Sequence, residues 1–280
     1  MSSILIYGEV LFDRIPKPGQ SPETGELFLG GAPANCAAGL SLHDDIDTFF
    51  VGGVGTDELG RRAFRALQEC GIDLRYITRT DAPTRIVHVA HDRLTGRRSF
   101  GGFQHGRDTK YADEDVEEIL LHHALFEQTC ALAYTGSLAM DGEHSRSATR
   151  ELLHITREKG IPVFFDVNMR SAFFQSETDM LESVSEILAS VSIVKISADE
   201  LPLLFQHLFA CDANTDFSKK ASLRTMCERL EERFETLEVV FLTFGEQGSY
   251  VHKRGGEEWH AILEGVETVD ETGAGDAYCA

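Results

Sequence analysis

Along the chain, short apolar runs alternate with longer stretches in which apolar residues recur at helical spacing. Short runs are typical of buried strands, and the longer pattern is typical of amphipathic helices. Apolar side chains at 223, 226, 227, 230 and 234 illustrate the helical pattern. The short runs predict strands over residues 3–8, 48–54, 131–136, 162–168, 192–197, 239–245 and 249–253. The longer stretches predict helices over residues 34–42, 57–70, 113–123, 143–159, 178–189, 198–209 and 219–235.

Strands that alternate with helices predict a mostly parallel sheet with helices on both faces. The expected fold class is therefore a three-layer α/β/α, Rossmann-like fold. Ligands of such folds bind beyond the carboxyl ends of the strands, so polar residues at those ends are candidate site residues. The chain has Asp13, Asn168, Arg170, Ser197, Thr243 and Gly245 at such positions.

One segment departs from this alternation. Residues 84–104 read as two alternating strands joined by the turn "DRLTG". With residues near 10–29, they predict a small β-sheet separate from the large one. Such a flap would serve as a lid that excludes water or as a dimer surface, and a plain surface hairpin is the alternative.

Composition and charge restrict the classes of partner that the chain is expected to bind. The chain has 26 Lys and Arg against 46 Asp and Glu, a formal net charge of −20. This argues against nucleic acid as a partner, because phosphate binding needs a basic surface. A small anionic ligand needs only a local pocket of N–H groups and stays open. No apolar run approaches the roughly 18 residues of a membrane span, so we expect no membrane partner.

The cysteines and the N-terminus indicate a cytoplasmic protein. Six cysteines are scattered without a C-x-x-C pair, which is typical of reduced thiols rather than of a disulfide framework or a zinc site. The first 13 residues lack the basic region of a signal peptide. The histidines show no metal-ligand spacing either.

Two internal glycine-rich stretches were tested for nucleotide motifs. "GGAPAN" (30–35) precedes a helix of small residues, and its glycines permit close approach of a ligand or only a tight turn. "GGVGTDELG" (52–60) is no dinucleotide fingerprint, because Glu58 stands where the third glycine is needed. The chain also has no G-x-x-x-x-G-K-[ST] sequence, so nicotinamide oxidoreductases and P-loop enzymes are disfavoured.

The stretch "DETGAGDA" (270–277) combines a candidate anion-binding turn with a carboxylate. Residues 272–275 can present successive backbone N–H groups at a helix N-terminus, where an anion is favoured. Asp276 has two alternative roles there. It either complements the helix dipole or accepts a proton from a hydroxyl that attacks a phosphoryl group held by those N–H groups. Spacing alone leaves both roles open.

Together these residues resemble a known family, the ribokinase-like carbohydrate kinases of the phosphofructokinase-B type. "DETGAGD" is similar to the C-terminal signature of that family, and residues 30–60 are similar to its N-terminal signature. "GEVLFD" (8–13), "FDVNMR" (165–170) and "VKISADEL" (194–201) resemble further blocks, most like those of fructokinases. The resemblance covers essentially the whole chain and implies a ribokinase-like fold.

The resemblance implies roles for residues on the sugar side. Asp276 would be the catalytic base, with Gly273, Ala274 and Gly275 as the anion hole for the transferred phosphate. The sugar hydroxyls would bind Asp13, Gly30, Gly31 and Asn35, with Asn168 and Arg170 lining the sugar or phosphate side. Phe100 and Phe103 of the lid would close over the sugar.

On the nucleotide side, the resemblance implies that ATP lies along Lys195, Ser197, Thr243, Gly245 and Gly248. Glu200 would lie near Mg²⁺, with water between them. The family often has Asn where this chain has Ser197, so this residue matches less well. It also often uses a monovalent cation such as K⁺ near the anion hole.

The expected function is thus an ATP-dependent kinase acting on a sugar hydroxyl, with fructose as the expected acceptor. Alternatives within the family are 2-keto-3-deoxygluconate, ribose or a nucleoside, and an alternative of another class is a non-catalytic sugar-binding protein. We expect one kinase domain over residues 1–280 and a homodimer through the lid. Members of the family continue for some tens of residues, so we also expect that C-terminal helices are missing from this chain.

Overall fold

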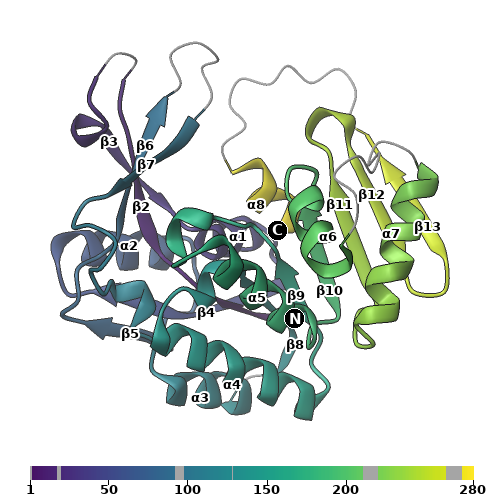
Figure 1. Cartoon of the computed structure of the whole chain (residues 1–280). Coiled ribbons are helices and arrows are strands. Elements are labelled where there is room, and N and C mark those ends of the chain that lie inside the picture. Colours follow the sequence, from purple (N-terminus) through teal and green to yellow (C-terminus); the bar gives the residue numbers. More distant parts are fainter. Residues whose placement is uncertain (1, 18–19, 92–97, 128, 211–219, 263–272) are drawn as a thin grey trace.

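The computed structural model describes residues 2–17, 20–91, 98–127, 129–210, 220–262 and 273–280. A nine-stranded sheet runs through the molecule (Figure 1). In spatial order its strands are β13 (Glu257–Ala261), β12 (Ser249–Lys253), β11 (Val239–Thr243), β10 (Ile193–Ser197), β9 (Val163–Asp166), β8 (Cys130–Gly136), β1 (Ser2–Tyr7), β4 (Ile46–Gly55) and β5 (Ile77–Thr80). Neighbouring strands from β11 to β5 are parallel, whereas β12 and β13 are added antiparallel.

Alternating side chains of the strands supply two separate cores. Leu5 and Tyr7 of β1 lie in the core on one face of the sheet, and Ile6 lies in the core on the other face. All three side chains are fully buried. Both faces of a central parallel strand must therefore be covered by helices, which explains its nearly continuous apolar sequence.

Helices cover the two faces unequally. The first core contains side chains from α3 (Glu118–Glu127), α4 (Glu143–Lys159), α5 (Glu177–Leu188), α6 (Leu201–Phe209) and α7 (Lys220–Arg233). The second core contains side chains from α1 (Ala32–Leu40), α2 (Glu58–Glu69) and the short α8 (Ala274–Cys279). The result is the predicted three-layer α/β/α arrangement.

Local signals in the sequence fix several helix ends. The Asp57 side chain accepts a hydrogen bond from the N–H of Gly60 and caps the start of α2. Ser176 caps α5 in the same way through the N–H of Asp179. Gly160 ends α4 in a left-handed conformation, with φ of 65°.

A second, four-stranded sheet projects beyond one end of the large sheet (Figure 1). Its order is β3 (Glu26–Gly30), β2 (Leu11–Ile15), β6 (Ile86–His91) and β7 (Arg98–Phe103). β2 pairs antiparallel with β3 and parallel with β6, and β6 and β7 form the predicted pair of strands. The predicted small sheet is therefore confirmed, and we call it the lid.

Some predicted elements differ from the structure. The predicted helix over 113–123 is wrong at its start, because Ala112–Glu114 form a 3₁₀ turn and α3 begins at Glu118. Arg85 binds the side chains of Asp113 and Glu114. These bonds hold residues 112–114 in a turn that is separate from α3. Strands β5 and β13 were not predicted. Within the described residues, no helix has the length and apolarity needed to cross a membrane.

Candidate active site

The two glycine-rich signatures meet at the carboxyl ends of the central strands. α8 packs against α1 near the C-terminus of the chain (Figure 1). Asn35 Nδ2 of α1 donates a hydrogen bond to Asp276 Oδ2 of α8 at 2.7 Å. The structure thus brings together the residue predicted to bind a sugar hydroxyl and the residue predicted to be the base.

The Asp276 carboxyl lies in a partly buried and electrostatically mixed environment. Burial is the largest influence and raises its pKa above the ordinary value for aspartate. The hydrogen bond from Asn35 and the positive charges of Lys195 and Arg170 act in the opposite direction. The carboxyl is therefore more basic than an exposed aspartate, while its ionised form still has a donor and two cations nearby.

Beneath α8 lies a buried ion pair. Lys195 Nζ in the middle of β10 lies 2.9 Å from Asp166 Oδ1 at the end of β9, and both side chains are almost fully buried. Tyr134 donates its hydroxyl to Asp166 Oδ2 at 3.3 Å, and the Cys279 thiol of α8 donates to the same oxygen at 3.7 Å. A Cβ added at Gly275 would lie 3.2 Å from Lys195 Nζ. The ammonium group therefore sits directly under the predicted anion hole.

This placement refines the prediction for Lys195. Burial is the largest influence and opposes its charge, but Asp166, Cys279 and Glu200 together outweigh that effect, and the pKa of Lys195 is raised. The ammonium group is hydrogen-bonded to Asp166. A contact between Lys195 and a nucleotide stays a prediction. Sequence reasoning missed Asp166, although a carboxylate closing the apolar run of β9 is a usable signal.

The predicted sugar-binding turn lies beside Asp13 of the lid. A Cβ added at Gly30 would lie 2.5 Å from Asp13 Oδ2, so a side chain there would displace that carboxylate. Gly31 has φ of 104°, which favours glycine, and its carbonyl accepts the backbone N–H of Asn35 at 2.9 Å. Asp13 therefore lies beside the glycine turn, and Asn35 is hydrogen-bonded to that turn through Gly31; their predicted contacts with sugar hydroxyls stay predictions.

Aromatic residues connect the lid with the loop after β9. The ring of Phe103 at the end of β7 packs edge-to-face on Phe173, with centroids 4.9 Å apart. Phe173 belongs to the same loop as Arg170. Phe103 thus stands between the lid and the predicted sugar side. The Phe100 side chain lies outside the described residues, so its predicted role stays untested.

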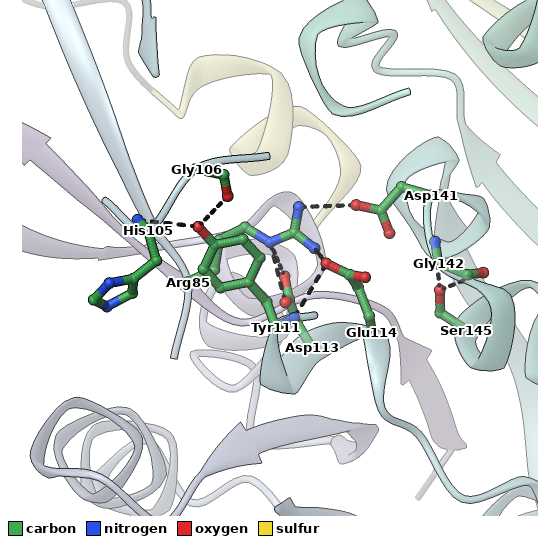
Figure 2. A network of polar contacts seen from close by, with 9 residues as sticks. All are labelled: Arg85, His105, Gly106, Tyr111, Asp113, Glu114, Asp141, Gly142 and Ser145. Atoms are coloured by element: carbon green, nitrogen blue, oxygen red, sulfur yellow. Dashed lines mark hydrogen bonds and ion pairs between the residues drawn. The ribbon is translucent and has the colours of Figure 1, made fainter. Parts of the chain in front are cut away.

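A buried arginine, which the sequence analysis did not single out, anchors the base of the lid. Arg85 immediately precedes β6 and is bonded to three carboxylates: Asp113 at 3.1 Å, Asp141 at 2.8 Å and Glu114 at 2.6 Å (Figure 2). Its guanidinium also lies over the ring of Phe103 at 5.6 Å. Since these carboxylates come from segments outside the lid, Arg85 fixes the lid to the body of the molecule.

The loops after β9 and β10 are joined by Glu200. Its Oε1 accepts the N–H of Met169 at 2.6 Å, and its Oε2 accepts the N–H of Ser197 at 2.7 Å. Asn168 stands in the first of these loops with φ of 36°. Glu200 therefore shapes the backbone around Asn168 and Ser197. Its predicted proximity to Mg²⁺ stays a prediction.

The predicted nucleotide residues follow β10 and β11. Ser197 and Thr243 are direct neighbours in the parallel pair, so their half-buried side chains lie on the same face of the sheet. Gly245 and Gly248 follow with φ of 57° and 87°. A Cβ at Gly248 would lie 2.0 Å from the carbonyl oxygen of Ala261, so the turn is built for glycine. Residues 263–272 lie outside the described residues, and with them Thr272.

The chain is similar in sequence to known carbohydrate kinases. The model of the pfkB family carbohydrate kinases matches residues 1–280. Fructokinase-1 of Zea mays is 28% identical over 283 residues, covering 98% of this chain and 80% of the relative. An ATP-dependent 6-phosphofructokinase of Thermoanaerobacterium thermosaccharolyticum is 29% identical over 283 residues, covering 98% of this chain and 78% of the relative.

A solved structure is similar as well. The fructokinase of Xylella fastidiosa with bound ATP has a TM-score of 0.82 and 26% identity, covering 99% of this chain and 78% of that one. Two sequence signatures, the lid and the large sheet thus agree with one family. The chain belongs to the pfkB family of carbohydrate kinases.

Proposed function

We propose that this chain is an ATP-dependent kinase that transfers the γ-phosphoryl group to a sugar hydroxyl, with Asp276 as the base and fructose as the acceptor. One observation carries the proposal: the hydrogen bond between Asn35 and Asp276, which joins a predicted sugar-binding residue to a carboxylate of raised pKa. A hydroxyl bound near Asn35 would lie next to a group able to accept its proton.

The reaction would proceed in one displacement. Asp276 accepts the proton of the attacking hydroxyl as the new bond forms between the sugar oxygen and the γ-phosphorus. The bond between the γ-phosphorus and the bridging oxygen of ATP breaks, and ADP leaves with that electron pair. The backbone N–H groups of residues 273–275 and the Lys195 ammonium beneath them would stabilise the negative charge on the phosphoryl oxygens.

The described residues are compatible with ATP and Mg²⁺. The adjacent hydroxyls of Ser197 and Thr243 and the side-chain-free turn at Gly245 and Gly248 offer polar groups and close backbone approach. Bound to the phosphates, Mg²⁺ would neutralise part of their charge. Each carboxylate oxygen of Glu200 keeps acceptor capacity beyond its one backbone partner, enough for a water ligand of the metal.

Asp13, Arg170 and the named relatives bear on the identity of the acceptor. Relatives of similar identity are named as a fructokinase and as a 6-phosphofructokinase. Asp13 can accept two hydroxyl donors, which suits a neutral sugar, while exposed Arg170 leaves room for an acidic one. 2-Keto-3-deoxygluconate, ribose and a nucleoside therefore remain alternative acceptors.

A parallel acceptor assay tests this proposal. ADP release from Mg·ATP is followed with fructose, fructose 6-phosphate, ribose, 2-keto-3-deoxygluconate and adenosine. We expect the highest kcat/KM with fructose. A higher kcat/KM with another acceptor would support the proposed kinase activity and assign it a different substrate. Sugar binding without ADP release from any acceptor would instead favour a non-catalytic sugar-binding protein.

We also propose that two copies associate through their lids. Phe28 stands on β3, an edge strand of the lid, and has 48% of its surface exposed. A second lid would cover such a face. Light scattering at micromolar concentration should give twice the mass of the chain, and a monomeric mass would refute this assembly.

A further inference from the structure

Glu9 is a buried carboxyl to which the sequence assigned no role. It follows β1, where the chain leaves the large sheet for the lid, and has only 6% of its surface exposed. Its Oε1 accepts the backbone N–H of Ala32, the first residue of α1, at 3.0 Å. The N-cap residue of α1 is Gly31, which has no side chain to provide a cap. Glu9 therefore caps α1 from a distant segment.

The backbone of Glu9 also shapes the predicted sugar-binding turn. A Cβ added at Gly31 would lie 2.6 Å from the Glu9 carbonyl oxygen and 3.4 Å from its Cγ. Gly31 is held in a conformation with φ of 104°. Only glycine fits this close approach, so Glu9 defines the position of the turn through both its backbone and its side chain.

This contact is connected to the proposed base. The Gly31 carbonyl accepts the N–H of Asn35 at 2.9 Å, and the Asn35 side chain is bonded to Asp276 at 2.7 Å. A rotation of the first turn of α1 would move Asn35 relative to the carboxylate. The cap provided by Glu9 opposes such a rotation.

We propose that Glu9 is a positioning residue that holds the sugar-binding turn and, through Asn35, the catalytic base. The inference rests on the proposed function and adds a residue to it. Glu9 touches neither reacting atom. It acts by fixing the start of α1, where Gly30, Gly31 and Asn35 are arranged.

The surroundings of Glu9 favour its neutral form. Within the described part of the chain, Glu9 Oε2 has no hydrogen-bond partner. Burial is the main reason that the pKa of Glu9 is raised to about 8, and the negative charges of Asp113 and Asp141 add to the effect. Arg85 is bonded to both of these aspartates, and the buried Tyr7 is a further titratable group near Glu9. Ionisation above pH 8 would place an unbalanced charge beneath the turn.

Two substitutions separate the positioning role from a general loss of folding. Glu9→Gln keeps an oxygen acceptor for Ala32 and stays neutral, whereas Glu9→Met fills similar space without an acceptor. Glu182→Met on the exposed face of α5 is the matched control. For each protein we would measure fructose binding by calorimetry at pH 7 and 9, KM for fructose and for ATP, and amide hydrogen exchange of residues 31–36.

We expect Glu9→Met to raise Kd and KM for fructose about tenfold or more, as loss of a buried acceptor implies, with KM for ATP nearly unchanged. Exchange of residues 31–36 should accelerate in this variant alone. Glu9→Gln should recover most of the affinity. It should also lack the weakening of fructose binding that we expect in the unsubstituted protein between pH 7 and 9.

The outcomes separate this inference from the proposed function. Unchanged exchange and unchanged fructose affinity in Glu9→Met would overturn the role of Glu9. Equal increases in KM for fructose and for ATP would also overturn it, because they indicate a general structural effect. If the unsubstituted protein binds no fructose, the proposed acceptor fails, and the exchange measurement alone still decides whether Glu9 holds the turn.

Discussion

The side-chain amide of Asn35 donates a hydrogen bond to Oδ2 of Asp276 at 2.7 Å, although 241 positions separate the two residues. The bond joins the first turn of α1 to the first turn of α8, so each signature positions a residue of the other. A donor on the proposed base stabilises its ionised form and fixes its direction. The two signatures thus meet at the proposed site.

Replacing Asn35 by leucine should lower kcat/KM and shift its pH dependence. The hydrogen bond from Asn35 lowers the pKa of Asp276, and burial already holds that pKa above the ordinary value. Without the donor the pKa rises further, so activity is lost at a higher pH as the solution is acidified. A pH–rate profile measures this shift.

The matched control for this experiment is Gln68→Leu, which removes an exposed amide from α2. The acidic limb of the pH–rate profile of Gln68→Leu should coincide with that of the unsubstituted protein. An Asn35→Leu profile that also coincides with it would show that the bond has no influence on the ionisation of the base.

The Lys195–Asp166 pair should influence both stability and the base. Lys195→Met leaves Asp166 buried without its cation, which typically costs about 3–5 kcal/mol of the free energy of unfolding. It also removes a positive charge that lowers the pKa of Asp276, so the acidic limb of the rate profile moves to higher pH. Denaturant unfolding and pH–rate profiles measure the two effects.

The double variant Lys195→Met/Asp166→Asn provides the comparison, since it removes both charges. It should lose less stability than Lys195→Met, and its acidic limb should return toward the original position. If Lys195→Met and the unsubstituted protein have the same profile, the charge of Lys195 does not act on Asp276.

The Arg85 cluster should make the lid attachment depend on pH. Arg85→Met leaves Asp113, Asp141 and Glu114 without their cation, and a loss of about 3–5 kcal/mol is expected. Arg150→Met breaks an exposed pair with Glu186 and should cost less than about 1 kcal/mol. Denaturant unfolding of both variants tests the contrast between a buried and an exposed arginine.

The sign of the pH effect follows from the raised carboxyl pKa values. Burial is the main reason that the pKa of Asp113 is about 6 and that of Glu114 about 7, despite the opposing charge of Arg85. Protonation of such groups favours the folded state, so their contribution is complete at low pH and lost as the pH rises through these values. Arg85→Met should therefore be more destabilised at pH 8 than at pH 5. Equal losses at both pH values would contradict this account.

The sequence predicted the fold better than the network that surrounds the site. The helix expected over 143–159 has the same bounds as α4, because its apolar period and terminal Gly160 are local signals. Strand β13 was missed, since "EEWHA" carries mostly exposed polar side chains and no apolar run. Apolar spacing and a terminal glycine depend only on residues that are close together in the sequence.

Buried charges are harder to infer, because their partners lie far away in the sequence. Arg85 reads as a surface residue beside a strand, and Asp113, Glu114 and Asp141 read as polar positions of turns or helices. The contacts that bury them span 28–56 positions. Asp276 and Asn35 could be assigned only because each stands in a motif of its own.

The most direct test of the central claim compares Asp276→Asn with the unsubstituted protein. The asparagine side chain has nearly the same size but cannot accept a proton from the attacking hydroxyl. Turnover in the coupled ADP-release assay should fall about 10²–10⁴-fold, while calorimetry should show an almost unchanged Kd for the sugar. Near-original turnover in Asp276→Asn would contradict the assignment of Asp276 as the base.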